Sequence, residues 1–264
     1  MTSGSCDTWS NACALQFALA TAASGDEIWV KAGVYYPGAA GNRSATFTLK
    51  NGVALYGGFA GTETSLDQRN ISANPTICSG DIGKEADKSD NCYHVFYHPN
   101  GTNLDNTAVL DGLTIRLGNA DGDNPHNTGG GIYNHTSSPS ITNCIFENNS
   151  AMNGGGGIYN YNSSPSITES TVKNNVSNYS MGGGIYNELS SPTITDCTFE
   201  SNTAFLSYGG GICNSNESSP GMTACTFKNN TGDYGGGGIY NEKKSSPTIT
   251  KCVFTGNTVP GGDN

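Results

Sequence analysis

Basic residues are scarce in this chain, and no stretch of the sequence gathers them. The chain carries 12 Lys and Arg against 22 Asp and Glu, a formal net charge of -10. Proteins that bind nucleic acids neutralise phosphates with clustered Lys and Arg, so the sequence argues against a nucleic-acid partner. Long apolar runs are also missing, since none approaches the ~18 residues needed to span a membrane. We therefore predict no membrane insertion by this sequence.

Charged residues make up only 13% of the chain and aromatic residues 9%, whereas glycine occurs 37 times. Such a composition is typical of disorder unless the apolar residues recur at a fixed spacing. Here five segments that begin Gly-Gly-Gly-Ile align almost without gaps, and their isoleucines lie 26, 27, 27 and 27 residues apart. The five anchoring residues are Ile132, Ile158, Ile185, Ile212 and Ile239.

Each repeat predicts one coil of a solenoid. The pattern Ile-Thr-x-Cys-Thr-Phe has the period of two of a strand, interrupted by one residue where the chain bends, and Ser-Ser-Pro predicts a corner. In the third repeat, Ile194, Cys197 and Phe199 then point inward, and Thr195 and Thr198 point outward. Coils of the form strand–turn–strand–turn would stack equivalent side chains ~4.8 Å apart. The predicted fold is all-β, a single-stranded right-handed parallel β-helix (solenoid) with a short N-terminal capping α-helix.

The predicted β-helix domain covers residues 1–264. Residues 1–25 form an N-terminal cap, with a helix at about 10–24 that covers the open end of the stack. Residues 26–128 form irregular coils, and residues 129–264 form five regular coils of about 27 residues. No comparable cap is apparent after the last coil, so end-to-end self-association through the C-terminal coil is a further expectation. In the irregular part we predict strands at 27–36, 45–50, 52–59, 74–81, 94–98 and 107–118.

The nine cysteines fall into two groups. Cys6 with Cys13, and Cys78 with Cys92, flank short polar segments, and each pair is a candidate disulfide that would place the protein in an oxidising, extracellular setting. The alternative is that all four are free thiols. A column within the repeats is predicted to hold free, buried thiols, because in-register Cβ vectors fit the torsion of a disulfide poorly. This column contains Cys144, Ser170, Cys197, Cys225 and Cys252.

The motifs Gly-Gly-Gly-Ile and Phe-x-x-Asn, once per coil, resemble the repeats of chlamydial polymorphic outer-membrane proteins and related bacterial surface β-helix proteins. Residues 26–30 and 55–63 are similar to the N-terminal region of large secreted bacterial proteins with such repeats. The resemblance implies an extracellular or cell-surface location and a role in adhesion. On this basis we expect a non-enzymatic surface protein that acts in recognition or as a rigid spacer, with a glycan or a host or cell-surface protein as partner.

Two columns are predicted to face outward from the regular coils. Exposed tyrosines could stack on sugar rings or on a partner protein, although they could also stack on one another and cover the glycine-rich backbone. Regular threonines could order water, which makes ice binding an alternative, but threonine is also a good strand former. The candidate recognition stripe is Tyr133, Tyr159, Tyr186 and Tyr240, and the threonine column is Thr142, Thr168, Thr195, Thr223 and Thr250.

The alternative from another class is a polysaccharide lyase or glycoside hydrolase, because β-helices also host such enzymes and the fold alone does not decide. Their chemistry needs clustered carboxylates. The position before the column cysteine reads Asn143, Glu169, Asp196, Ala224 and Lys251, which contains no matched pair, so we predict no catalytic residue. Asp121 and Asp123 are weak candidates for a structural Ca²⁺, and no other cofactor is expected.

Overall fold

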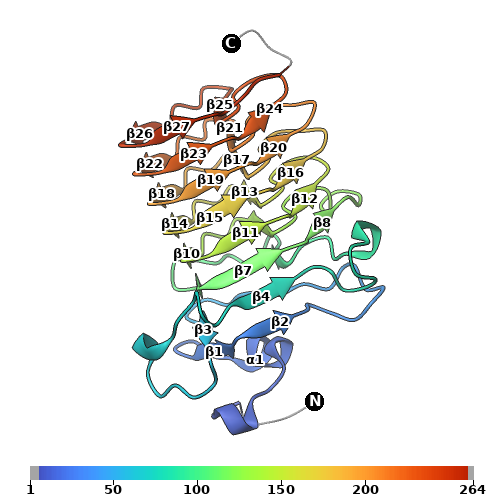
Figure 1. Ribbon diagram of the computed structural model, residues 1–264, viewed down its shortest axis with the longest axis vertical. Helices are drawn as coiled ribbons and strands as arrows, with labels where there is room; N and C mark the ends of the chain where they lie inside the picture. The colour runs from blue at the N-terminus through green and yellow to red at the C-terminus, as the bar shows by residue number, and fades with distance from the viewer. Residues whose placement is uncertain (1–5, 261–264) are drawn as a thin grey trace.

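The computed structural model describes residues 6–260 and shows a stack of parallel strands that rises from the N-terminal to the C-terminal end (Figure 1). Two eight-stranded sheets run along the stack, and sheets of six and five strands complete the coils. Ile141, Ile167 and Ile194 lie in register on successive coils. The predicted all-β parallel β-helix is confirmed. Residues 1–5 of the predicted cap and 261–264 of the predicted fifth coil lie outside the described residues.

The four sheets are called A to D here. Sheet A contains β1 (Glu27–Lys31), β3 (Ala54–Phe59), β6 (Val109–Asp111), β10 (Ser140–Thr142), β14 (Ser166–Thr168), β18 (Thr193–Thr195), β22 (Gly221–Thr223) and β26 (Thr248–Thr250). Sheet B contains β2 (Gly33–Tyr35), β4 (Thr76–Ser79), β7 (Leu113–Arg116), β11 (Ile145–Glu147), β15 (Thr171–Lys173), β19 (Thr198–Glu200), β23 (Thr226–Lys228) and β27 (Val253–Thr255). Sheet C contains β5 (Phe96–His98), β9 (Ile132–His135), β13 (Ile158–Tyr161), β17 (Ile185–Glu188), β21 (Ile212–Ser215) and β25 (Ile239–Asn241). Sheet D contains β8 (Asn119–Ala120), β12 (Ser150–Ala151), β16 (Val176–Ser177), β20 (Thr203–Ala204) and β24 (Thr231–Gly232).

A regular coil passes through sheets C, A, B and D in turn, so the prediction of two strands per coil is wrong. The chain bends at the residue before the column cysteine, as predicted, and it bends again between sheets B and D, where Asn148 and Ser201 have φ values of 56° and 55°. Asn143 has a φ of 52° and Asp196 a φ of 53°, in the left-handed region, which turns the chain between sheets A and B. The predicted inward and outward directions hold on either side of this bend. Ile194, Cys197 and Phe199 are fully buried, whereas Thr195 and Thr198 are half-buried.

Ladders of buried polar side chains join the coils. In the predicted asparagine ladder, Asn175 donates its amide to Phe146 O at 2.9 Å and to Asn202 Oδ1 at 3.0 Å. A second ladder, which we did not predict, is headed by His98 and continues on sheet C. A third consists of serines whose hydroxyls accept backbone N–H groups of the preceding coil, as Ser190 does for Ser163 at 2.9 Å. The three ladders are Asn149, Asn175, Asn202, Asn230 and Asn257; Asn134, Asn160, Asn187, Asn214 and Asn241; and Ser137, Ser163, Ser190 and Ser218.

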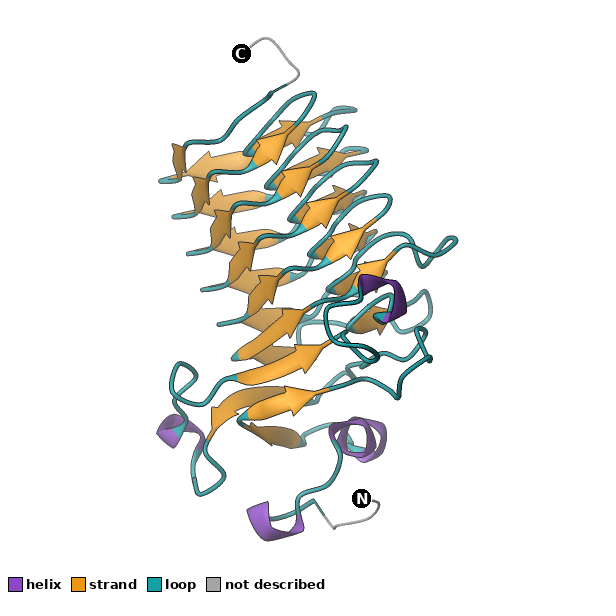
Figure 2. Cartoon of the chain, turned by 45° about the vertical axis from the view of Figure 1, so that its right-hand side comes forward, coloured by secondary structure: helices purple, strands orange, loops and turns teal. Residues whose placement is uncertain are grey.

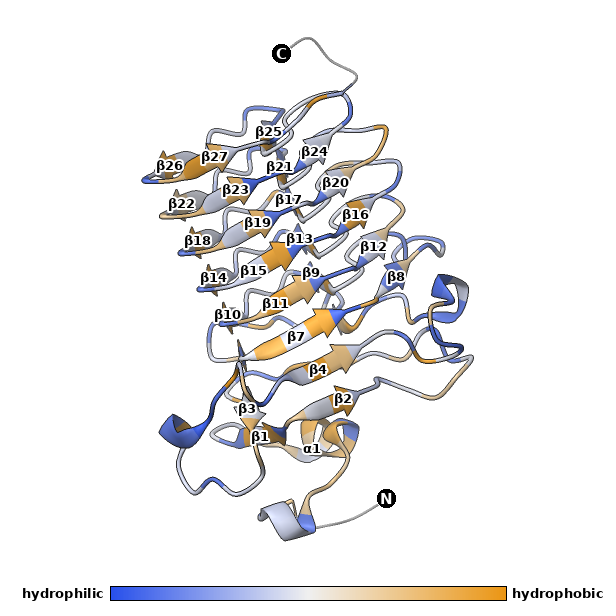
Figure 3. Ribbon diagram, viewed as in Figure 1, coloured by the Kyte–Doolittle hydropathy of each residue, from blue (hydrophilic) through white to orange (hydrophobic). Residues whose placement is uncertain are grey.

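Apolar columns fill the remaining interior, and Figure 3 marks hydrophobic residues on β7, β11 and β15 in orange. Phe227 stacks on Phe199 and on Phe254, with 4.7 Å between ring centroids in both pairs. The repeat cysteines are free, as predicted. Cys144 donates its thiol to Thr142 O at 3.2 Å, and burial raises the pKa of this thiol to about 12. These columns account for the Phe and Cys of each repeat. On the last described coil, Ile249, Val253 and Phe254 are exposed.

The glycine run of each repeat lets neighbouring coils approach closely (Figure 2). A Cβ on Gly131 would lie 2.5 Å from Gly157 O on the next coil, a distance that no side chain tolerates. Gly155 also has a φ of 62°, which favours glycine. The Gly-Gly-Gly-Ile motif is therefore a requirement of stacking.

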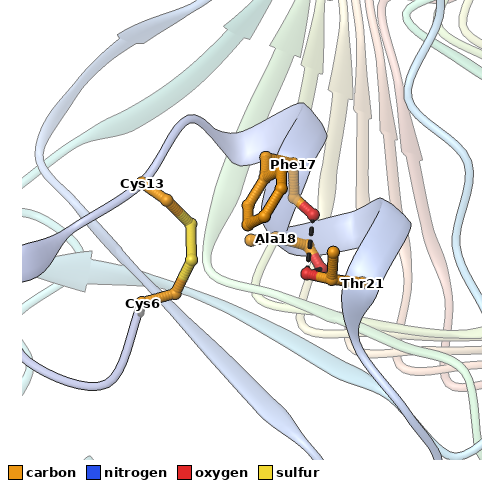
Figure 4. The surroundings of a disulfide bond; sticks show 5 residues. All are labelled: Cys6, Cys13, Phe17, Ala18 and Thr21. Carbon is orange, nitrogen blue, oxygen red and sulfur yellow. Dashed lines mark hydrogen bonds between the residues drawn. A yellow bond between two sulfur atoms is a disulfide. The ribbon is translucent and has the colours of Figure 1, made fainter. Parts of the chain in front are cut away.

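The N-terminal cap is less helical than predicted. Instead of one helix at about 10–24, the chain forms a 3-10 turn η1 (Trp9–Asn11) and the helix α1 (Leu15–Thr21). Ala14 and Ala22 have ψ values of 140°, which end the helix on both sides. Cys6 and Cys13 form a disulfide beside α1 (Figure 4). Only Leu15 and Leu19 of α1 are buried, so the helix packs on the stack through a narrow stripe.

The irregular coils bring two further corrections. Residues 45–50 form no strand, and Phe47 pairs with Phe96 only through an isolated bridge. Cys78 and Cys92 are buried free thiols, so the predicted disulfide between them is absent. Cys78 faces the interior from β4, whereas Cys92 donates its thiol to His94 O at 3.2 Å.

The remaining short helices, η2 (Leu66–Gln68) and η3 (Lys88–Asp90), lie in loops. Within the described residues, no helix is long and apolar enough to cross a membrane.

Candidate recognition face

The tyrosine column lies on the outer face of sheet C, but its rings are not exposed to solvent along the whole column. Tyr97, Tyr133, Tyr159 and Tyr186 stack in sequence, with centroid distances of 5.0, 5.4 and 5.4 Å. Tyr133 is 7% exposed and Tyr159 8%. The glycine-rich turns cover these rings, since a Cβ on Gly154 would lie 2.7 Å from Tyr186 Cδ1. The prediction of an exposed tyrosine stripe is wrong for Tyr133 and Tyr159.

The next outward position on sheet C, two residues after each tyrosine, is chemically different in almost every repeat. We call this column the variable row. Its members at β9, β13 and β17 are half-buried at the surface, where they are available to a ligand. The variable row consists of His135, Tyr161, Glu188, Ser215 and Glu242, and the first four are in register on successive strands.

Contacts along the variable row fix its side chains. The rings of His135 and Tyr161 meet edge to face at 4.8 Å. Glu188 accepts hydrogen bonds from the Tyr159 hydroxyl at 2.8 Å and from Asn216 Nδ2 at 3.0 Å. The variable row, together with the adjoining Asn216, therefore presents an aromatic ring, a carboxylate and an amide whose positions are fixed by contacts within the protein.

A surface hollow of about 510 Å³ lies at the corner that follows the variable row. It is lined by Leu189, Asn216, Glu217, Lys243 and Lys244. Through Asn216, which bonds to Glu188, the hollow adjoins the row. The lysines form ion pairs at this corner, Lys243 with Glu242 at 3.3 Å and Lys244 with Glu217 at 3.9 Å.

Burial dominates the electrostatics of the covered tyrosines. Desolvation raises the pKa of Tyr133 to about 12, and it raises the pKa values of Tyr159 and Tyr186, with the negative charge of Glu188 as the next cause. These phenols therefore remain protonated and act as hydrogen-bond donors. Tyr159 uses its proton to hold the Glu188 carboxylate in place.

The threonine column lies on the outer face of sheet A. Thr142, Thr168 and Thr195 are half-buried, and Thr223 and Thr250 are exposed. The neighbouring outward column on the same strands is Ser140, Ser166, Thr193, Gly221 and Thr248, so this face lacks the matched columns that ordered water would need.

Asp121 and Asp123 are not brought together as metal ligands. The carboxylate of Asp121 accepts hydrogen bonds from the Arg43 guanidinium and from Asn119 Nδ2, so its charge is already paired. Arg43 also lies over the Tyr93 ring, 4.3 Å from its centroid. Across residues 6–260, no group of three His, Cys, Asp and Glu side chains is placed to hold a metal ion.

A larger hollow of about 1110 Å³ lies between the cap and β1. Trp29 stacks on Phe59 there at 4.8 Å, and Trp9 packs against both rings. The indole N–H of Trp9 already donates to Glu63 O and that of Trp29 to Glu27 Oε2, each at 2.9 Å. The hollow is the seam between the cap and the first coil, and both indole N–H groups in it are satisfied internally.

Sequence reasoning missed the variable row because it looked for unbroken columns. The signal was the opposite one: after the nearly constant Gly-Gly-Gly-Ile-x-Asn, residue type changes from repeat to repeat until the Ser-Ser-Pro corner. Residue type is uniform at the positions where coil stacking constrains the side chain. It can therefore vary only at positions that stacking does not constrain.

A comparison with protein families gives one match. The family model described as "Right handed beta helix region" matches residues 50–259. No curated protein and no solved structure matches the chain.

Proposed function

Because the chain belongs to the right-handed β-helix family, we propose that it serves outside the cell as a rigid, non-enzymatic scaffold whose variable row binds carbohydrate. The observation that carries this proposal is the held arrangement of His135, Tyr161 and Glu188 on register-matched strands. An adhesive role on a bacterial surface follows the resemblance of the repeats to those of polymorphic outer-membrane proteins.

The chemistry of the row suits a sugar. An aromatic ring packs against the apolar face of a pyranose, and a few fixed polar groups orient the ligand. Tyr161 supplies the ring, the Glu188 carboxylate can accept hydrogen bonds from sugar hydroxyl groups, and Asn216 offers an amide.

The rigidity of the stack and the disulfide near its N-terminal end support the same proposal. The three polar ladders hold successive coils in register, so the row is pre-organised and loses little conformational entropy on binding. The Cys6–Cys13 disulfide favours an oxidising compartment.

A glycan array followed by titration of a retained oligosaccharide tests the proposal. We expect the Tyr161→Ala substitution to weaken binding about tenfold, because an aromatic contact contributes roughly 1–1.5 kcal/mol. The matched control is Tyr36→Ala, which removes a 51% exposed tyrosine beside β2 and should leave binding unchanged. Equal effects of the two substitutions, or retention of no glycan, would contradict the proposal.

A second candidate, a glycoside hydrolase, rests on one specific observation. Glu188 and Glu242 occupy the same row two coils apart, with Ser215 between them. At ~4.8 Å per coil their backbones are about 10 Å apart, near the upper end of the roughly 6.5–9.5 Å carboxyl separation of inverting enzymes.

The scaffold proposal predicts that polysaccharides incubated with the protein release no reducing ends. Catalysis by this pair would instead give a release that Glu188→Gln and Glu242→Gln each lower by about a thousandfold or more. Such a result would establish the enzyme, and a release that neither substitution affects would point to a contaminant.

A further inference from the structure

The loop from Gly80 to Asn91 leaves the stack beside β8 and carries η3 (Figure 1). Its two ends meet, because Cys92 N donates to Gly80 O at 2.8 Å. Arg43 Nε donates to Asn91 O at 2.7 Å, and Asn119 Nδ2 donates to Lys88 O at 2.9 Å. The loop is therefore closed at its neck and held against the neighbouring coil.

Two carboxylates fold back over this loop. Asp81 Oδ2 accepts from Ala86 N at 3.4 Å, and Asp90 Oδ2 accepts from Lys84 N at 2.7 Å. The other oxygen of each carboxylate, Oδ1, is buried and has no hydrogen-bond partner. In each carboxylate, Oδ2 thus accepts a hydrogen bond from the loop backbone, whereas Oδ1 accepts none.

Asn91 adds a third buried oxygen. The whole residue is 3% exposed, and its Nδ2 donates to Leu117 O at 2.8 Å, which fixes the orientation of the amide. Its Oδ1 has no partner. Five buried side-chain atoms lack a partner in the described part of the chain, and three of them are oxygens of this one loop.

A buried acceptor without a donor costs free energy, and a carboxylate oxygen costs more than an amide oxygen. A cation bound among the three oxygens would remove this cost. Carboxylate and amide oxygens are hard ligands, and Ca²⁺ accepts six to eight of them in flexible geometry, whereas Mg²⁺ demands a near-ideal octahedron. We propose that the Gly80–Asn91 loop binds Ca²⁺ through Asp81 Oδ1, Asp90 Oδ1 and Asn91 Oδ1, with loop carbonyl groups and water completing the shell.

This site differs from the one at Asp121 and Asp123 that the sequence suggested. It holds only two acidic side chains, and its third ligand is an amide. Gly83 supports the arrangement, since a Cβ there would lie 2.2 Å from Asp90 Oδ2 and push the carboxylate aside. A Gly83→Ala substitution therefore displaces a ligand without changing the charge of the loop.

Calorimetric titration of the intact protein with CaCl₂, after treatment with EDTA, tests the proposal first. We expect one Ca²⁺ per chain with a dissociation constant between about 10⁻⁴ and 10⁻³ M, the range of extracellular sites, and weaker binding of MgCl₂. Asp90→Asn, which turns an amide N–H₂ toward the cation, and Gly83→Ala should each weaken binding at least about tenfold. The matched control is Asp123→Asn, an exposed carboxylate in the neighbouring loop, which should bind Ca²⁺ as the wild type does.

Trypsin cleavage locates the site. Lys84 and Lys88 are exposed in the loop, and Lys243 and Lys244 are exposed at a distant corner. At a Ca²⁺ concentration ten times the dissociation constant, cleavage at Lys84 and Lys88 should slow about tenfold relative to cleavage at Lys243 and Lys244. Absence of binding by the wild-type protein, equal loss in Asp123→Asn, or equal protection at both places would overturn the proposal, whether or not the loop variants fold.

Discussion

Replacing Asn202 with alanine is expected to lower the free energy of unfolding by about 4 kcal/mol. The side chain of Asn202 makes four hydrogen bonds. It donates to Val172 O at 2.8 Å and to Asn230 Oδ1 at 2.9 Å, and it accepts from Asn175 N at 3.1 Å and Asn175 Nδ2 at 3.0 Å. Alanine would leave Val172 O and Asn175 N buried without these partners, at a cost of ~1–3 kcal/mol for each group.

Urea unfolding followed by circular dichroism measures this loss. Asn153→Ala is the matched control, because Asn153 is an exposed asparagine in a nearby turn, and it should change stability by less than ~0.5 kcal/mol. If Asn202→Ala were as mild as its control, the polar ladders would not hold the coils together.

Acidification is expected to destabilise the protein before its carboxylates are protonated. Burial lowers the pKa of His94 to about 3 and that of His98 to about 4. Both folded-state values lie below the ordinary histidine value of ~6.5, so the unfolded chain binds more protons between these limits. The stabilisation is complete above pH ~6.5 and is lost as the pH falls toward the folded values.

The geometry explains why both rings stay neutral. His98 accepts from Leu49 N at 3.3 Å through Nε2 and pairs with Asn134 Oδ1 at 2.7 Å through Nδ1. His94 pairs with Gly129 O at 2.9 Å and with the His126 ring at 3.0 Å. Each buried ring thus uses one nitrogen as a donor and the other as an acceptor. Between pH 6.5 and 4.5 the two histidines together should cost about 5 kcal/mol of stability.

Urea unfolding at several pH values in this window checks the prediction. His98→Asn is the informative variant, because position 98 heads the second asparagine ladder and asparagine can continue it. The variant should lose only about half as much stability on acidification as the wild type. An unchanged pH dependence in His98→Asn would rule out the buried neutral histidines as its source.

Much of the fold is predictable because stacking repeats its demands once per coil. The columns that contain Ile194, Cys197, Phe199 and Asn202 read directly from the repeat. Four strands per coil were harder to foresee, because the short strands of sheet D follow a second bend, which is made by residues as different as Asn148 and Ser201 held at positive φ. Residue type alone does not signal such a bend.

The candidate sites were less predictable, and for a physical reason. Alternation correctly places Tyr159 outside the coil, but it does not show that the glycine-rich turns fold over the ring. Asp90 and Asn91 stand in a polar loop with no repeat to mark them, and only the fold reveals that their oxygens are buried without partners. The exposure of a side chain and the number of its hydrogen-bond partners depend on which coils and turns pack against each other.

Hydroxyl-radical footprinting with a bound oligosaccharide tests the proposed recognition face most directly. His135 and Tyr161 are half-buried and oxidisable, and the account predicts that the ligand protects both, together with Leu189 beside the adjoining hollow. Oxidation of exposed Tyr36 and Phe17 at the N-terminal end should not change. Protection at Tyr36 and Phe17 with none at His135 and Tyr161 would contradict the account.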